Sequence, residues 1–215
     1  MKKNTIAIVP AFNEEKTIGK VIKNLLNYVN EVIVVSDCSS DNTLKISKKF
    51  NALVLNNKFN MGPDYSIEKG IKLALKLNYK YILTFDADDQ HPYEKIPTFL
   101  KKLEKNEADI IIGQRKVFPR FAEYFYSFYA KSKIGVPDPI NGFKAIRSDV
   151  IKKIGYFDNI DSLTSQVLFN AYKVGYKLEN VKINVKDRKD KPRIGGMFKS
   201  NFKILKSLIK IMLIK

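Results

Sequence analysis

The chain has 215 residues and a hydrophobic content of 45%, which suits one folded domain with a full core and excludes a disordered protein. Its formal net charge of +17 favours a polyanionic partner such as an anionic lipid or a phosphorylated substrate, although a lysine-rich solvated surface would give the same charge. The single cysteine, Cys38, excludes an intramolecular disulfide framework and suits a reducing compartment.

Strands and helices are predicted to alternate along the first half of the chain. The apolar runs and helical spacings place strands at 5–9, 31–35, 52–55 and 81–85, and helices at 18–26, 42–50 and 63–77. Asn13 and Asp41 are the expected N-caps of the first two helices. Strands that alternate with helices predict an α/β domain with a parallel, doubly wound sheet.

The second half continues the pattern and ends in a basic helix. We expect strands at 109–113, 143–146 and 177–185, and helices at 93–105, 148–154, 162–174 and 198–215. Between them, four phenylalanines repeat at spacings of three and four and predict a further helix with Pro119 at its start: Phe118, Phe121, Phe125 and Phe128. We divide the chain into one domain over 1–197 and a C-terminal helix over 198–215.

The segment 81–92, YILTFDADDQHP, is the centre of the predicted site. A buried strand ends at a group of acids, of which Asp86 and Asp88 are one residue apart, followed by Gln90 and His91. Carboxylate and amide oxygens suit a hard divalent cation, while a solvated acidic turn that caps the next helix is the alternative. Ligands of such sheets bind beyond the C-terminal ends of the strands, where 10–14, 36–41 and 86–91 converge.

Seven segments, in order, resemble glycosyltransferase family 2, and most closely its polyprenyl- or dolichyl-phosphate mannosyltransferase and glucosyltransferase group. They are VPAFNEE (9–15), EVIVVSDCSSDNT (31–43), TFDADDQHP (84–92), IIGQR (111–115), DPINGFKA (138–145), GYKLENVKINVKDR (175–188) and RIGG (193–196). The resemblance implies the GT-A fold, which is Rossmann-like and mostly parallel with helices on both sheet faces. It also implies an inverting, metal-dependent enzyme that uses a nucleotide-diphosphate sugar.

The resemblance assigns site residues by matching positions. Those that match nucleotide-binding positions are Pro10, Phe12, Glu14, Val35 and Asp37. Those that match the diphosphate- and metal-binding motif are Asp86, Ala87, Asp88 and Gln90, with Asp86, Asp88 and Gln90 as ligands of Mg²⁺ or Mn²⁺. The matching basic residues are Arg115, Arg188 and Arg193, where Arg188 and Arg193 lie on a loop that covers the donor phosphates. We expect Asp88, Arg115 and Arg188 to be catalytic, because metal and guanidinium charge stabilise a departing diphosphate.

Other positions leave alternatives open. The segment containing Asp138, Asn141 and Lys144 matches the family's acceptor-side region, but it also fits a capped turn ahead of a strand. His91, the only histidine, fits a supporting role better than direct catalysis.

Several residues depart from the family pattern. Ser36 replaces an acid, Phe12 replaces a tyrosine, and Pro63-Asp64 replaces Lys-Gly. Gln166 stands where the family often has glutamate, and an amide cannot act as a general base. A lipid phosphate is already anionic and needs no base, so this departure favours a polyprenyl-phosphate acceptor. Transfer to a glycan hydroxyl and a catalytically silent, membrane-associated sugar-nucleotide-binding module remain the alternatives.

The C-terminal helix suggests contact with a membrane. Lys199, Lys203, Lys206 and Lys210 form one stripe, and the opposite side carries Phe198, Phe202, Leu205, Ile209 and Met212. Such a helix can lie in an anionic interface or pack its apolar side on the core. No apolar run reaches the roughly 18 residues of a membrane span. With no secretory signal and no nucleic-acid-binding motif recognised, we expect a peripheral protein on the cytoplasmic face of a membrane.

Overall fold

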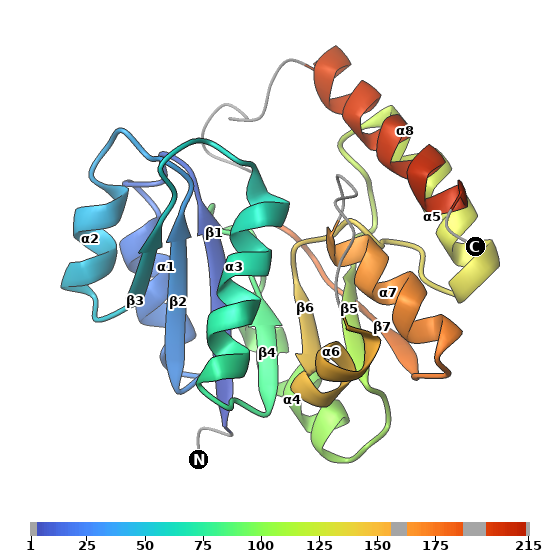
Figure 1. Ribbon diagram of the computed structural model, residues 1–215, viewed down its shortest axis with the longest axis horizontal. Helices are drawn as coiled ribbons and strands as arrows, with labels where there is room; N and C mark the ends of the chain where they lie inside the picture. The colour runs from blue at the N-terminus through green and yellow to red at the C-terminus, as the bar shows by residue number, and fades with distance from the viewer. Residues whose placement is uncertain (1–3, 156–162, 187–196, 214–215) are drawn as a thin grey trace.

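A seven-stranded sheet forms the centre of the computed structural model, which describes residues 4–155, 163–186 and 197–213 (Figure 1). The strand order is β3-β2-β1-β4-β6-β5-β7. The strands are β1 (Thr5–Ala11), β2 (Glu31–Ser36), β3 (Leu53–Asn56), β4 (Tyr81–Thr84), β5 (Ile110–Gln114), β6 (Lys144–Arg147) and β7 (Leu178–Lys182). β6 is antiparallel to both of its neighbours and the other pairs are parallel, which confirms a mostly parallel sheet.

Helices cover both faces of this sheet. They are α1 (Ile18–Leu25), α2 (Thr43–Lys49), α3 (Pro63–Lys76), α4 (Ile96–Glu104), α5 (Phe121–Ile134), α6 (Ser148–Ile154), α7 (Leu163–Lys173) and α8 (Met197–Leu213), with a short 3-10 turn at Tyr93–Lys95. Side chains of α1 and α4 join the core on one face, and those of α3, α5, α6, α7 and α8 join the core on the other.

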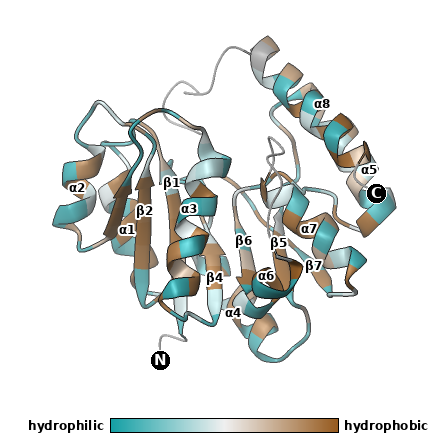
Figure 2. Cartoon of the chain, viewed as in Figure 1, coloured by the Kyte–Doolittle hydropathy of each residue, from teal (hydrophilic) through white to brown (hydrophobic). Residues whose placement is uncertain are grey.

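The central strands are apolar along their whole length because both of their faces are buried. Ile6 and Ile8 of β1 belong to one core, while the intervening Ala7 and Val9 belong to the other. Figure 2 shows the resulting hydrophobic colour along β1 and β2. Burial on both faces explains why these strands read as continuous apolar runs rather than as alternating ones.

β1 is longer than the predicted strand, because it continues through Pro10 to Ala11. Pro10 pairs with Val35 of β2, whereas the pairing of β1 with β4 ends at Ile8 and Thr84. Proline lacks an N–H and is tolerated only where the ladder needs no donor. The early end of β4 therefore permits a proline at this central position.

Asn13 does not cap α1, whereas Asp41 does cap α2, although the N-cap position itself is Asn42. Asn13 has a φ of 55° and lies ahead of α1, which begins at Ile18. The Asn13 Oδ1 atom instead accepts a hydrogen bond of 2.8 Å from the backbone N–H of Ser40, joining two loops at the same sheet edge. Asp41 accepts a 2.9 Å bond from the backbone N–H of Thr43, the first residue of α2, and so caps that helix from one position further out than a usual N-cap.

α8 packs beside α5 (Figure 1). Its inward side carries the buried residues Ser200, Ser207, Leu208 and Ile211. The predicted apolar side faces outward, and its exposed members are Phe198, Phe202, Leu205, Ile209 and Met212. Of the predicted lysine stripe, Lys203 and Lys206 are exposed and Lys210 is partly exposed, while the side chain of Lys199 lies outside the described part. Within the described ranges, no helix combines the length and hydropathy needed to cross a bilayer.

Candidate active site

The acidic loop after β4 lies at the C-terminal edge of the sheet, as predicted. The Asp86 carboxylate bonds to the Nε2 atom of buried His91 at 2.8 Å, and 43% of the Asp86 side chain is exposed. Burial alone raises the pKa of Asp86, but His91, Lys144 and Arg115 together lower it below its usual value. His91 therefore orients an ionised Asp86, which agrees with its expected supporting role.

The DPINGFKA segment packs directly against Asp86. A Cβ atom built on Gly142 would lie 2.1 Å from Asp86 Oδ1, so only glycine leaves room for this carboxylate. The hydroxyl of Thr84 donates a 2.6 Å bond to the carbonyl of Gly142 and holds the two segments together. Ala87 is buried in the core beside α1 and α4 and so anchors the acidic loop to the protein body.

Gln90 joins the acidic loop to the segment after β7. Its backbone N–H donates to Asp88 Oδ1 at 3.2 Å, and its side-chain Nε2 donates to the carbonyl of Lys186 at 2.7 Å. The N–H of Lys186 donates back to the carbonyl of Gln90 at 3.0 Å. The chain leading to the predicted Arg188 and Arg193 is thus attached to the acidic loop, although both arginines lie outside the described residues.

The donors of this loop fit a hard divalent cation. Asp86 and Asp88 supply carboxylate oxygens and Gln90 an amide, which is the ligand chemistry that Mg²⁺ and Mn²⁺ prefer. Within 4–155, 163–186 and 197–213, no three His, Cys, Asp or Glu side chains gather as a metal-binding group. Two carboxylates and one amide leave coordination positions open, as Mg²⁺ sites do when the ion is shared with waters and substrate phosphates.

The predicted nucleotide-binding residues lie on the neighbouring strands β1 and β2 or in the loops that follow them. Buried Asp37 accepts bonds from the backbone N–H groups of Met61 and Gly62 at 2.9 and 2.7 Å, and from Asn57 Nδ2 at 2.8 Å. It thus holds the loop ahead of α3, where Gly62 has a φ of +89°. The side chain of Val35 packs in the core. A nucleotide contact by either residue stays a prediction.

The remaining members of that set lie at the C-terminal end of β1. Pro10 and Phe12 are partly exposed, and Glu14 is buried. The Glu14 carboxylate accepts a 3.0 Å bond from the hydroxyl of Thr17, and its N–H donates to Thr43 Oγ1 at 2.8 Å. Their contacts with a nucleotide also stay predictions.

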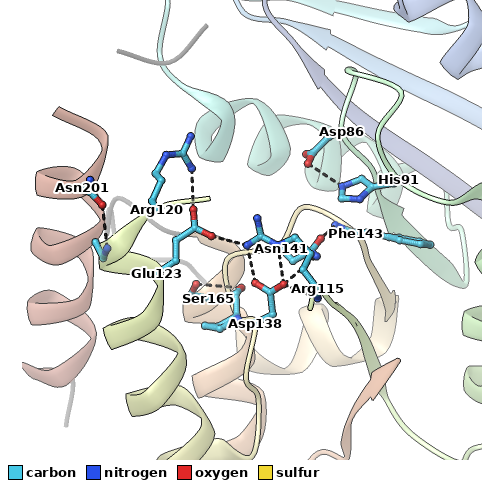
Figure 3. A network of polar contacts seen from close by, with 12 residues as sticks. Asp86, His91, Arg115, Arg120, Glu123, Asp138, Asn141, Phe143, Ser165 and Asn201 are labelled. Carbon is cyan, nitrogen blue, oxygen red and sulfur yellow. Dashed lines mark hydrogen bonds and ion pairs between the residues drawn. The ribbon is translucent and has the colours of Figure 1, made fainter. Parts of the chain in front are cut away.

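Arg115 lies at the centre of a buried polar network (Figure 3). Its Nε and Nη2 atoms each bond to one oxygen of Asp138 at 2.8 Å, and Nη2 also bonds to Glu123 at 2.7 Å. Arg120 contacts the other oxygen of Glu123 at 3.1 Å. Burial alone would lower the pKa of Arg115. The carboxylates of Asp138 and Glu123 outweigh this effect and raise the pKa above its usual value, so the guanidinium stays charged. Arg115 is held rigidly, and its predicted catalytic role remains untested.

Glu123 is the main member of this network that sequence reasoning missed. Its only signal was the three-residue spacing from Arg120, a common helical ion-pair spacing that does not reveal burial. The aromatic helix begins at Phe121 rather than at the predicted Pro119, so Phe118 precedes α5 and places its ring 5.5 Å from the Arg115 guanidinium.

The segment 138–144 forms a buried, capped turn. Asn141 Oδ1 accepts a 2.8 Å bond from the N–H of Phe143, and Lys144 donates from its buried ammonium to the carbonyl of Asn141. Burial lowers the pKa of Lys144 to about 8, against the opposing influence of Asp138 and other carboxylates. Of the two alternatives from the sequence, the structure displays the capped turn, and an acceptor contact stays a prediction.

Asp64 has a structural role that the sequence did not reveal. Its carboxylate accepts a 2.9 Å bond from the N–H of Leu163 and so caps α7. Burial raises the pKa of Asp64, partly offset by the charge of Lys203. Further along α7, Ser165 donates to the carbonyl of Pro139 at 3.3 Å, and Gln166 is buried. The departure at Pro63-Asp64 thus serves the packing of α7.

Comparison with known proteins identifies similar sequences. Residues 6–155 match the model of the Glycosyl transferase family 2. An uncharacterized protein of Methanocaldococcus jannaschii is 39% identical over 71% of this chain and 76% of its own length. The dolichol-phosphate mannosyltransferase of Pyrococcus furiosus is 31% identical over 68% of this chain and 47% of its own length. The dolichyl-phosphate hexose transferase of Haloferax volcanii is 26% identical over 96% and 92%.

A solved structure has the same fold. It is glucosyl-3-phosphoglycerate synthase from Mycobacterium tuberculosis in complex with Mn²⁺, UDP and glucosyl-3-phosphoglycerate, with a TM-score of 0.74. The match covers 96% of this chain and 80% of that one at 16% identity. This likeness confirms the expected GT-A fold.

Proposed function

Because this chain belongs to glycosyl transferase family 2, we propose that it transfers mannose or glucose from a nucleotide-diphosphate sugar to a polyprenyl or dolichyl phosphate. Relatives that are named for dolichol- or dolichyl-phosphate substrates support this acceptor class. The observation that carries the choice of acceptor is the buried Gln166 on α7, at the position where the family often has a carboxylate base. A phosphate acceptor needs no such base.

The proposed reaction is a single displacement. A phosphate oxygen of the lipid attacks the anomeric carbon from the side opposite the leaving group. The bond between that carbon and the diphosphate oxygen breaks, the sugar inverts its configuration, and the nucleoside diphosphate departs. Positive charge close to the departing diphosphate lowers the barrier most, because negative charge develops there in the transition state.

The acidic loop is suited to the donor side of this reaction. Asp86, Asp88 and Gln90 would hold Mg²⁺ or Mn²⁺, and a bound ion would neutralise charge on the diphosphate. His91 keeps Asp86 ionised and oriented through its 2.8 Å contact. Through Lys186, Gln90 would direct the following segment, with Arg188 and Arg193, toward the same phosphates.

A donor and acceptor screen tests the proposal. Purified protein would be incubated with GDP- and UDP-hexoses, polyprenyl phosphate and Mn²⁺, and lipid-linked sugar would be detected by extraction and mass spectrometry. We expect a lipid-linked hexose with at least one donor. Transfer only to glycan hydroxyls would overturn the acceptor assignment, and failure with every donor and acceptor would favour a silent binding module.

A further inference from the structure

The outward sides of α5 and α8 carry large apolar side chains that the fold leaves exposed. Six of them define what we call the α5–α8 face: Phe121, Phe125, Phe128, Phe198, Phe202 and Ile209. Their exposed fractions lie between 50% and 94%. Soluble monomers rarely expose so many neighbouring apolar groups without a binding partner.

The residues of the α5–α8 face are not part of the hydrophobic core. α8 already buries a different side, with Leu208 and Ile211 in the core beneath it. The N-terminal ends of α5 and α8 are joined by a 3.0 Å bond from the N–H of Ala122 to Asn201 Oδ1 (Figure 3). The pair is therefore already packed against the protein body while the α5–α8 face points away from it.

The charges on the two helices indicate what covers this face. α5 exposes Lys131 and Lys133, and α8 exposes Lys203 and Lys206. The sole acidic residue in the sequences of both helices is Glu123, which is buried and bonded to Arg115. Aromatic and aliphatic side chains beside lysines, without exposed acid, match an anionic lipid interface. A second copy of the same face would instead bring lysines toward lysines.

We propose that the α5–α8 face lies on an anionic lipid bilayer, with aromatic side chains of both helices at the level of the headgroups. The proposal rests on the proposed function for its link to a lipid acceptor, and it extends the membrane contact from the C-terminal helix to α5. Glu123 of α5 bonds to Arg115, and Arg115 bonds in turn to Asp138 of the segment that matches the family's acceptor-side region. The acceptor side of the site would thus face the membrane.

Flotation with vesicles tests the surface. The full chain would be mixed with phosphatidylcholine vesicles with and without phosphatidylglycerol, at low and high salt. We expect flotation that depends on phosphatidylglycerol and weakens in salt, because the lysines are then screened. Combined Phe125→Ser, Phe128→Ser, Phe202→Ser and Ile209→Ser substitutions should reduce vesicle partitioning at least roughly tenfold, since each removes an apolar group that would leave water.

A matched variant controls for general loss of apolar surface. Tyr172 and Val174 are 50% and 54% exposed but lie at and just beyond the end of α7. The combined Tyr172→Ser and Val174→Ser variant should float as the unaltered protein does. Circular dichroism and thermal unfolding would show that each variant is folded. Equal flotation of the α5–α8 variant and the unaltered protein would overturn the proposal.

Two further measurements separate the other outcomes. Light scattering that shows a dimer of the unaltered protein and a monomer of the α5–α8 variant, without vesicle binding, would identify a second copy as the occupant and contradict the proposal. Transfer to a short, water-soluble polyprenyl phosphate tests the proposed function independently. Transfer without vesicle binding removes only the surface proposal, whereas vesicle binding that depends on the α5–α8 face without transfer removes only the proposed function.

Discussion

Asp86 and Asp88 are one residue apart, yet the fold holds them differently. Asp86 is bonded to His91 and packs against Gly142, while Asp88 accepts a bond from the N–H of Gln90. Asp86 is therefore constrained by its own loop, through His91, and also by a segment distant in sequence, through Gly142, whereas the bond to Asp88 comes from its own loop. This difference allows the two carboxylates to be tested separately.

Asp88→Ala should abolish transfer and leave the fold intact. The substitution removes a proposed metal ligand from a loop whose backbone has other supports, and the loss of metal charge raises the barrier by several kcal/mol. Transfer rates and circular dichroism would be measured with and without EDTA. Metal-independent transfer, or a variant as fast as the unaltered protein, would contradict the assignment.

Gly142→Ala should lower activity by displacing Asp86. The new Cβ atom would meet Asp86 Oδ1 at 2.1 Å, so either the carboxylate or the turn must move. Gly135→Ala is the matched control, because nothing lies within 4 Å of its Cβ position and its φ of +69° makes only the backbone strained. The control should lose about 1 kcal/mol of stability and keep its rate. Equal rates for both variants would show that Asp86 tolerates displacement.

Lys144 should make stability depend on pH. Its pKa is about 8 in the folded protein and ordinarily 10.5, so between these values the unfolded chain binds more protons. The free energy of unfolding should therefore rise as the pH increases through this window. Urea unfolding at pH ~7.5 and ~9.5 would compare the unaltered protein with Lys144→Met. The stability difference between them should shift in favour of lysine at the higher pH, and a constant difference would contradict the shifted pKa.

At the scale of elements, Glu123 connects α5 to the end of β5 through Arg115. Removing one partner of a buried ion pair costs about 3–5 kcal/mol, because the other charge is left without compensation. Glu123→Ala should therefore destabilise the protein strongly. Arg120→Ala removes only the more exposed partner of Glu123 and should cost about 0.5 kcal/mol. Urea unfolding would measure the stability of both variants. If Glu123→Ala costs as little as Arg120→Ala, the charge of Arg115 is compensated by Asp138 alone.

For the whole molecule, α8 is part of the core as well as of the exposed surface. Deleting 199–215 should lower Tm by several degrees or more, because it removes Leu208 and Ile211, and each large buried side chain contributes about 2–5 kcal/mol. Thermal unfolding would compare this deletion with the variant of the α5–α8 face, which should keep its Tm. An unchanged Tm after deletion would show that α8 packs only loosely. Substitution is therefore the better test of membrane contact.

The sequence by itself determined the α/β class, the position of most strands and helices, and the acidic loop at a strand end. These features depend on local properties: apolar runs, helical spacing, and polar residues that follow a strand. The ordered motifs were sufficient to predict the family. Asp41 was recognised as a cap because its partner, Thr43, is two residues away.

Only the tertiary structure decided which side of α8 is buried, that β6 runs antiparallel, and that Glu123, Asp64 and Gly142 support the site. Asp64 caps a helix that begins 99 residues later, and Gly142 contacts an aspartate from another strand end. Asn13 was misassigned because its partner, Ser40, is 27 residues away. Such contacts depend on which distant segments the fold brings together, and a local pattern along the chain does not contain that information. The pattern of α8 did not decide its buried side either, because more than one side of this helix is apolar enough to be buried.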